Sequence, residues 1–130
     1  MVEAKRKTAL VTGATDGVGR LVARELAKQG WRVLVGDREN NRVQLFDRAG
    51  NYLVEWGDFY HPMQIWIDDR DLVFVTDQIP RISLLTLDGN LVGRCRGAIN
   101  GAHGLCGDAD GNLYLSELPP QEITKLERLN

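Results

Sequence analysis

Residues 33–47 read VLVGDRENNRVQLFD, and this stretch marks the change from a helical to a β pattern. Residues 33–35 form an apolar run that is soon followed by the acidic Asp37, which is typical of a strand that ends in a turn. From Val43 apolar residues alternate with polar ones, the period of a half-buried strand. Beyond this point we therefore expect short strands separated by Gly-Asn and Asp-Gly turns.

The pattern of this stretch repeats along the chain. Asp37, Asp77 and Glu117 follow equivalent apolar runs at intervals of 40 residues, and the same interval separates Asp68 from Asp108. Each repeat reads as an apolar strand, an Asp-bearing turn, a second strand ending in an acid, a third strand, and a final strand after a Gly-Asn turn. The repeat predicts a four-stranded antiparallel meander.

A four-stranded repeat of about 40 residues has the size of one β-propeller blade. The first repeat lacks its leading strand, the second is complete, and the third ends at Asn130 before its fourth strand. We expect about two and a half blades, whereas closed propellers use about four to eight. The expected fold class is mostly β, with one α/β opening unit before the blades.

The opening segment, residues 8–35, follows a different pattern. Residues 8–12 read as a short buried parallel strand, and residues 31–35 as a second strand after Gly30. Between them, helical spacing predicts one helix over about residues 16–29. Its expected apolar face consists of Val18, Leu21, Val22, Leu26 and, less strongly, Ala23. Residues 1–35 are thus predicted to form a Rossmann-like βαβ segment, and residues 36–130 partial blades that can pack with it as one domain.

Residues 12–19, TGATDGVG, resemble the TGxxxGxG fingerprint of the short-chain dehydrogenase/reductase family. The resemblance implies an NAD or NADP cofactor whose pyrophosphate lies at the helix N-terminus. Gly13 would permit the tight turn, Gly17 the approach of backbone to pyrophosphate, and Gly19 the close packing of the helix. The implied cofactor-binding residues are Thr12, Gly13, Asp16, Gly17, Val18, Gly19, Asp37 and Arg38. The alternative is an inherited Gly-rich turn that holds no ligand.

Asp37 has two competing explanations. In the dehydrogenase family an acid at the end of the second strand binds the adenosine ribose hydroxyls, and Asp37 stands near the expected place. Asp37 also belongs to the 40-residue repeat. The neighbouring Arg38 could favour a 2′-phosphate, which leaves the choice between NAD and NADP open.

The catalytic pattern of the dehydrogenase family is absent. That family uses a tyrosine as acid and base, with a lysine four residues later. The three tyrosines, Tyr52, Tyr60 and Tyr114, are followed at that spacing by Trp56, Gln64 and Leu118. We therefore assign no catalytic residue.

Residues 37–47 also resemble the NHL repeat, a strand followed by D-x-x-N-x-R and a V-Q-x-F strand, and residues 35–130 are similar to the closing blades of an NHL-type propeller. Such propellers are usually binding platforms for protein or RNA, and one branch holds a metal through histidines. Here only His61 and His103 are present, at non-equivalent repeat positions, so no metal site is expected. Arg38, Arg42 and Arg81 could form a recognition patch, although pairing with Asp37 and Asp77 within the turns is the favoured interpretation.

The composition restricts the partners. With 16 Lys and Arg against 18 Asp and Glu, the net charge of −2 gives no electrostatic reason to expect a nucleic-acid partner. No apolar run approaches the ~18 residues of a membrane helix, and the basic start is too short for a signal peptide. Cys95 and Cys106 match neither a disulfide framework nor a zinc pattern, and both are expected to pack as reduced thiols in a cytoplasmic protein.

These patterns describe a chimera. An N-terminal segment with a dinucleotide-binding fold is followed by the last blades of a propeller. The favoured function is a non-catalytic binding or assembly module that retains at most a vestigial dinucleotide-binding loop. The alternative is an NAD(P)-dependent oxidoreductase of the short-chain dehydrogenase/reductase type. Because incomplete blades leave faces and edges open, we expect a homo-oligomer, and a protein partner could also bind through the blade faces.

Overall fold

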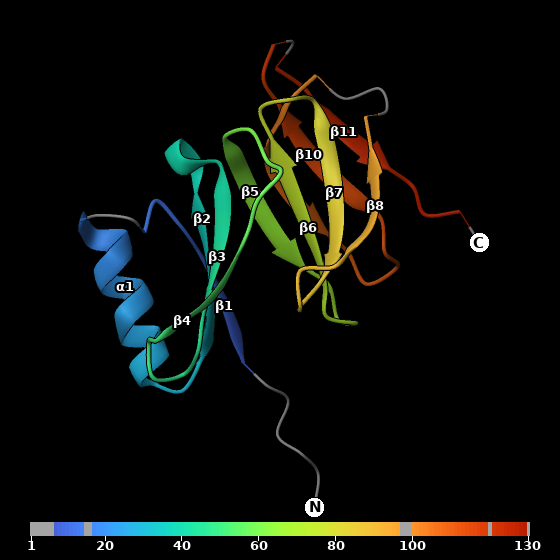
Figure 1. The fold of residues 1–130 in the computed structure, drawn as a ribbon. Helices are drawn as coiled ribbons and strands as arrows, with labels where there is room; N and C mark the ends of the chain where they lie inside the picture. Colours follow the sequence, from blue (N-terminus) through green and yellow to red (C-terminus); the bar gives the residue numbers. More distant parts are fainter. Residues whose placement is uncertain (1–6, 15–16, 97–99, 120, 130) are drawn as a thin grey trace, which may run out of the picture. The chain divides into compact units, whose positions relative to one another are not determined.

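The computed structural model describes residues 7–14, 17–96, 100–119 and 121–129 (Figure 1). Its elements, in chain order, are β1 (Thr8–Thr12), α1 (Gly17–Lys28), β2 (Arg32–Asp37), the 3-10 turn η1 (Arg38–Asn40), β3 (Arg42–Phe46), β4 (Tyr52–Trp56), β5 (Pro62–Ile67), β6 (Leu72–Asp77), β7 (Arg81–Thr86), β8 (Leu91–Cys95), β9 (Ala102–Gly107), β10 (Leu113–Glu117) and β11 (Ile123–Leu126). The chain divides into two compact units, Met1–Asp58 and Phe59–Asn130.

The first unit contains a four-stranded sheet in the order β1-β2-β3-β4. Strand β1 runs parallel to β2, with Leu10 opposite Leu34, whereas β2, β3 and β4 form an antiparallel meander. The first repeat was expected to lack its leading strand, and β1 of the βαβ segment occupies that place. The change of sequence pattern near residue 35 thus falls inside β2 and inside one sheet.

Helix α1 ends in the manner that its sequence predicts. Gly30 has φ 82°, its N–H donates to Ala27 at 2.9 Å, and the N–H of Trp31 donates to Leu26 at 3.1 Å. These two bonds form the Schellman motif that ends a helix at a left-handed glycine. In the part of the chain that the structure describes, no other α-helix occurs, which confirms the predicted switch to strands.

The helix face that packs on the sheet differs from the expected one. Ala27 and the partly buried Ala23 and Leu26 pack against Val33 and Val35 of β2. The other expected members of the face are exposed: Val18 at 77%, Leu21 at 66% and Val22 at 44%. The predicted orientation of the apolar face was wrong, because the main contacts of this helix are with β1 and β2, which cover one narrow side of it.

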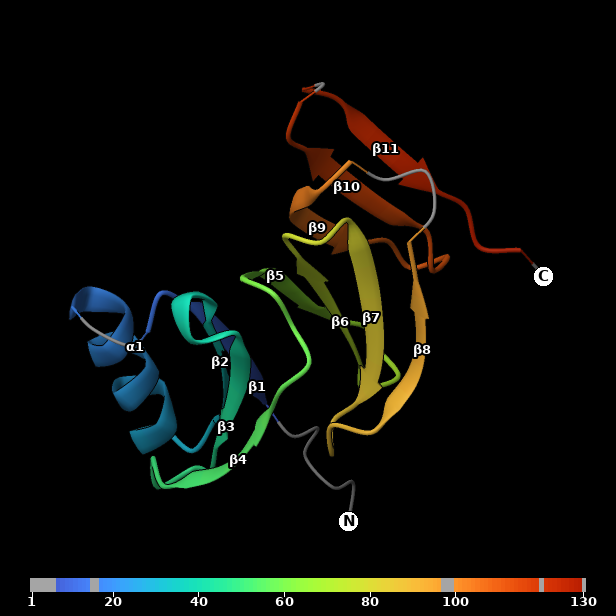
Figure 2. The ribbon, with the colours of Figure 1, turned by 45° about the horizontal axis from the view of Figure 1, so that its top comes forward.

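The second unit consists of two further antiparallel sheets, one of four strands (β5-β6-β7-β8) and one of three (β11-β10-β9). Strand β9 lies beside β5, so the two sheets pack together (Figure 2). Their shared core contains Ile82, Leu105 and Leu115, with Trp66 and Phe74 against it. The four-stranded sheet is the complete second blade that the repeat predicts, and the three-stranded sheet is the third blade without its fourth strand.

Aspartates fix the turns between strands. The side chains of Asp47, Asp68 and Asp108 each accept hydrogen bonds from the backbone N–H groups two and four residues later, at 2.8 to 3.0 Å. Asp108 also accepts from Asn112 Nδ2 at 2.9 Å and the Tyr114 hydroxyl at 3.0 Å. These donors, the Asn112 side chain foremost, lower the pKa of Asp108 to about 2.

Two remaining expectations concern cysteines and membranes. Cys95 and Cys106 are both free but exposed, so the expectation that they pack in apolar surroundings was wrong. Strands alternate their faces, and both thiols fall on the open face of their strand. Among the described residues, no helix is long and apolar enough to cross a membrane.

We predict that Gly107→Ala destabilises the second unit. A Cβ atom at Gly107 would fall on the Trp66 ring, which itself packs against Phe74 with ring centroids 5.2 Å apart. Displacing this pair should lower the free energy of unfolding by about 1–3 kcal/mol, as overpacking of a core usually does. Gly93→Ala is the matched control, because nothing lies within 4 Å of its added Cβ. Equal urea midpoints for the two variants would contradict this assignment.

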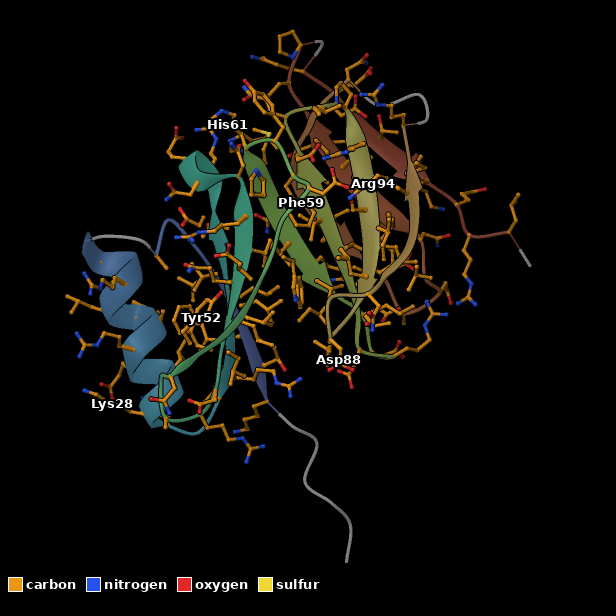
Figure 3. The ribbon with its side chains drawn as sticks, viewed as in Figure 1. Lys28, Tyr52, Phe59, His61, Asp88 and Arg94 are labelled. Carbon is orange, nitrogen blue, oxygen red and sulfur yellow. The ribbon has the colours of Figure 1, made fainter. Side chains whose placement is uncertain are left out.

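The second prediction concerns acid stability. Because the folded-state pKa of Asp108 lies below its ordinary value, its stabilising effect is present above about pH 4 and is lost as the pH falls toward about 2. Urea midpoints measured across this window should fall less for Asp108→Asn than for the native chain. Asp88→Asn removes a carboxylate from the β7–β8 turn (Figure 3) and should leave the native acid dependence in place.

Candidate functional site

The Gly-rich loop has the backbone geometry that its glycines predict. Gly13 and Gly17 have φ values of 65° and 61°, in the left-handed region that favours glycine. A Cβ at Gly19 would collide with the Gly13 carbonyl oxygen, so only glycine lets the first turn of α1 approach β1 so closely. Among the described residues beyond its chain neighbours, no heavy atom lies within 4 Å of a Cβ at Gly17. Thr12 and Val18 are exposed, and Asp16 lies outside the described residues.

Asp37 is not open to a ligand in this structure. Its carboxylate is 2% exposed and accepts hydrogen bonds from Asn40 Nδ2 at 2.9 and 3.0 Å and from Arg42 Nε at 2.8 Å. Arg42 also donates to Glu55 at 2.7 Å, and these partners raise the pKa of its guanidinium. Of the two explanations for Asp37, the contacts of its carboxylate fit the second, a role in the turn of the blade. Arg38 lies exposed beside Glu39, with 3.6 Å between the charged groups.

The same acid and arginine recur in the second blade. Arg81 Nη2 lies 2.7 Å from Asp77 Oδ2, and the N–H of Tyr60 donates to the same oxygen at 3.3 Å. Burial raises the pKa of Asp77, although Arg81 opposes that shift. The favoured interpretation, pairing with Asp37 and Asp77 within the turns, is confirmed for Arg42 and Arg81. Their guanidinium groups are therefore committed to the fold. For Arg38 this interpretation was wrong, because this arginine lies beside Glu39.

The third blade departs from this pairing. Glu117 is 4% exposed and its Oε2 accepts from the N–H of Asn100 at 2.8 Å, while Oε1 has no hydrogen-bond partner among the described residues. Gln121 and Glu122 follow where the other blades carry arginine. In this blade the buried acid, Glu117, is therefore held by a backbone N–H group and not by an arginine.

One tyrosine stands closer to a lysine than sequence spacing suggests. Tyr114 on β10 is the cross-strand partner of Lys125 on β11, a pairing that only the antiparallel register creates. The Tyr114 hydroxyl donates to Asp108 and the Lys125 ammonium lies 2.9 Å from Glu127. Asp108 raises the pKa of Tyr114, the opposite of the shift that a tyrosine acting as a base requires. Tyr114 therefore supports the turn at Asp108, whereas Lys125 pairs with Glu127.

The histidines lie apart from any cluster of metal-binding groups. His61 is half-buried with its ring edge-on to Tyr60, and His103 is exposed on β9. In the described ranges, no three His, Cys, Asp or Glu residues gather in a way that could hold a metal ion.

Comparison with known proteins supports two sources for the chain. The family model of short chain dehydrogenases matches residues 7–69. Similar curated proteins include the inactive hydroxysteroid dehydrogenase-like protein 1 of Pongo abelii, 31% identical over 55% of this chain and 25% of that protein. Serine 3-dehydrogenase of Agrobacterium fabrum is 34% identical over 49% of this chain and 23% of that protein. The chain spans about a quarter of the length of these relatives.

Solved structures of similar fold cover most of the chain. A streptogramin B lyase, which is a propeller, superposes with a TM-score of 0.57 over 78% of this chain and 42% of its own, at 10% identity. A protein of unknown function from Bacteroides caccae gives a TM-score of 0.56 over 65% of this chain and 34% of its own, at 20% identity. The N-terminal segment is thus short-chain-dehydrogenase-like and the remainder propeller-like. From β3 onward the strands are antiparallel, whereas a doubly wound sheet would continue with parallel ones.

Proposed function

We propose that this protein is a non-catalytic binding and assembly module. The observation that carries the proposal is the pairing of β1 with β2, through which the βαβ segment supplies a strand to an incomplete blade. A dinucleotide site needs the carboxyl ends of several parallel strands, and β1 and β2 are the only parallel pair of named strands in the described part of the chain. The segment therefore serves chiefly as a structural part of the first sheet.

The glycine loop is proposed to be a vestigial nucleotide site. Its glycines and the start of α1 suit a pyrophosphate, and one relative is an L-rhamnose 1-dehydrogenase (NAD(P)(+)) of Azotobacter vinelandii, 60% identical over 23% of this chain and 12% of that protein. The ribose, however, would find Asp37 already bonded to Asn40 and Arg42. Such a site would hold phosphates without selecting strongly between NAD and NADP.

The competing function, an NAD(P)-dependent oxidoreductase, rests on the family match, the glycine loop and the dehydrogenases among the relatives. A relative named as inactive shows that the match does not by itself bring activity. The free cysteines favour a reducing compartment, and we propose a cytoplasmic location.

We predict that the chain does not oxidise alcohols, because it lacks the tyrosine and lysine four residues apart that move the proton as hydride transfers. The measurement is formation of NADH or NADPH with a panel of alcohols. Any nucleotide affinity, measured by calorimetry, should disappear in Gly19→Val, whose side chain would displace the loop. Turnover that is lost on changing Tyr52, Tyr60 or Tyr114 would overturn the non-catalytic function.

The assembly role predicts self-association. In the three-stranded sheet β11 is an edge strand, and Ile123 on it is 71% exposed. Unpaired edges and apolar surface recruit other strands, and a charge placed on an edge blocks them. Sedimentation over a wide concentration range should show an oligomer whose association is weakened roughly tenfold by Ile123→Lys, the factor given by about 1.4 kcal/mol of lost contact.

Leu129→Lys is the control, because it makes the same change at an exposed residue beyond β11. A constant monomer mass for the native chain at all concentrations would contradict the assembly role.

A further inference from the structure

A hollow of about 550 Å³ lies in the first unit between helix α1 and the strands beneath it. Ala23, Ala27, Val33, Val35 and Phe46 provide its apolar lining. Tyr52, labelled in Figure 3, packs edge-on against Phe46 with ring centroids 6.0 Å apart. This volume falls within the range of small-molecule sites, which are mostly apolar with a few polar groups that orient the ligand.

The hollow exists because the chain leaves the dinucleotide fold after β2. In a doubly wound sheet a second crossover helix follows β2 and packs beside the first on the same face. Here β2 leads through the three-residue turn η1 into the antiparallel strand β3. In the described residues no second α-helix covers the sheet, so Gln44 and Phe46 of β3 stay partly exposed next to α1, whereas Val33 and Val35 of β2 are buried beneath it.

The rim of the hollow carries positive charge. Arg20 and Arg24 line it from α1, one helical turn apart, and Arg42 lines it from β3. Arg42 is bonded to Asp37 and Glu55, but neither Arg20 nor Arg24 forms an ion pair with any described residue. Like charges four residues apart destabilise a helix unless an anion lies between them. Within the described ranges, the two helix arginines therefore present guanidinium groups that no acidic side chain pairs, above an apolar lining.

We propose that this hollow binds a small amphipathic anion, with its carboxylate or phosphate group at Arg20 and Arg24 and its apolar body against Ala23 and Phe46, which are the partly exposed apolar residues of the lining. Guanidinium groups suit both anions, because their paired N–H donors match two oxygens. The cationic rim excludes amphipathic cations. The charged groups of this site lie on α1 and β3 and not on the glycine loop, although Ala14 of that loop also lines the hollow.

The test uses three probes with the same ten-carbon tail, namely decanoate, decyl phosphate and decyltrimethylammonium, titrated calorimetrically into the whole chain. Decanoate should bind at one site, and the cation should not bind. Decyl phosphate binding at least roughly tenfold tighter than decanoate would identify a phosphate ester as the natural class, whereas equal binding would indicate a carboxylate, both in accord with the proposal.

Two variants and a control locate the site. Arg20→Gln combined with Arg24→Gln keeps good helix formers and should weaken decanoate binding by roughly tenfold or more. Lys28→Gln, at the end of the same helix (Figure 3), removes a charge outside the lining and should change affinity by less than roughly twofold. Ala23→Leu should abolish binding by filling the hollow.

Some results would overturn the proposal. They are absence of decanoate binding to the native chain, equal affinity in the double arginine variant with unchanged helical circular dichroism, or equal binding of the cation. If Ala23→Leu does not fold, the arginine variant and the charge-reversed probe still decide the question. Binding of NAD in the presence of saturating decanoate would leave the nucleotide loop and this hollow as separate sites, in accord with the proposal.

Discussion

The parallel pairing of β1 with β2 is the constraint on which the first unit depends. Five residue pairs, from Thr8 with Arg32 to Thr12 with Gly36, hold the two strands in register. On its other edge β2 pairs antiparallel with β3, so one strand satisfies both a parallel and an antiparallel neighbour. Its residues Val33, Leu34 and Val35 are almost completely buried, as a strand covered on both faces requires. Without β1, the backbone of β2 would be an exposed edge.

The sequence predicts the elements of this fold better than their surfaces. The helix end at Gly30 and the aspartate turns of the 40-residue repeat depend on backbone conformation and on hydrogen bonds to near neighbours. The sequence pattern was therefore sufficient to predict where these elements end. The orientation of α1 was not predictable in this way, because Val18, Leu21 and Val22 have the spacing of a buried face but no strand to bury them. Helical periodicity states which side chains share a face, whereas the sheet that is present decides which face is covered.

The candidate site shows the same division between local and tertiary information. The need for glycine at residue 19 and the pairing of Asp37 with Arg42 follow from short-range geometry. The proximity of Tyr114 and Lys125 depends on strand register, and the hollow depends on a helix that never follows β2. Neither leaves a motif in the sequence. A contact across strands and a space left by an absent element become visible only in three dimensions.

The shared strand has a consequence for how such proteins can be recombined. Most domains meet at a linker, and each keeps its own core on either side of it. Here the exchange point between two architectures lies within β2, so the two parts are joined by backbone hydrogen bonding rather than by a surface between domains. Strand β2 is apolar and ends in Asp37, so it meets both the parallel register with β1 and the turn into β3. In this chain a single strand thus carries the hydrogen bonds of two architectures.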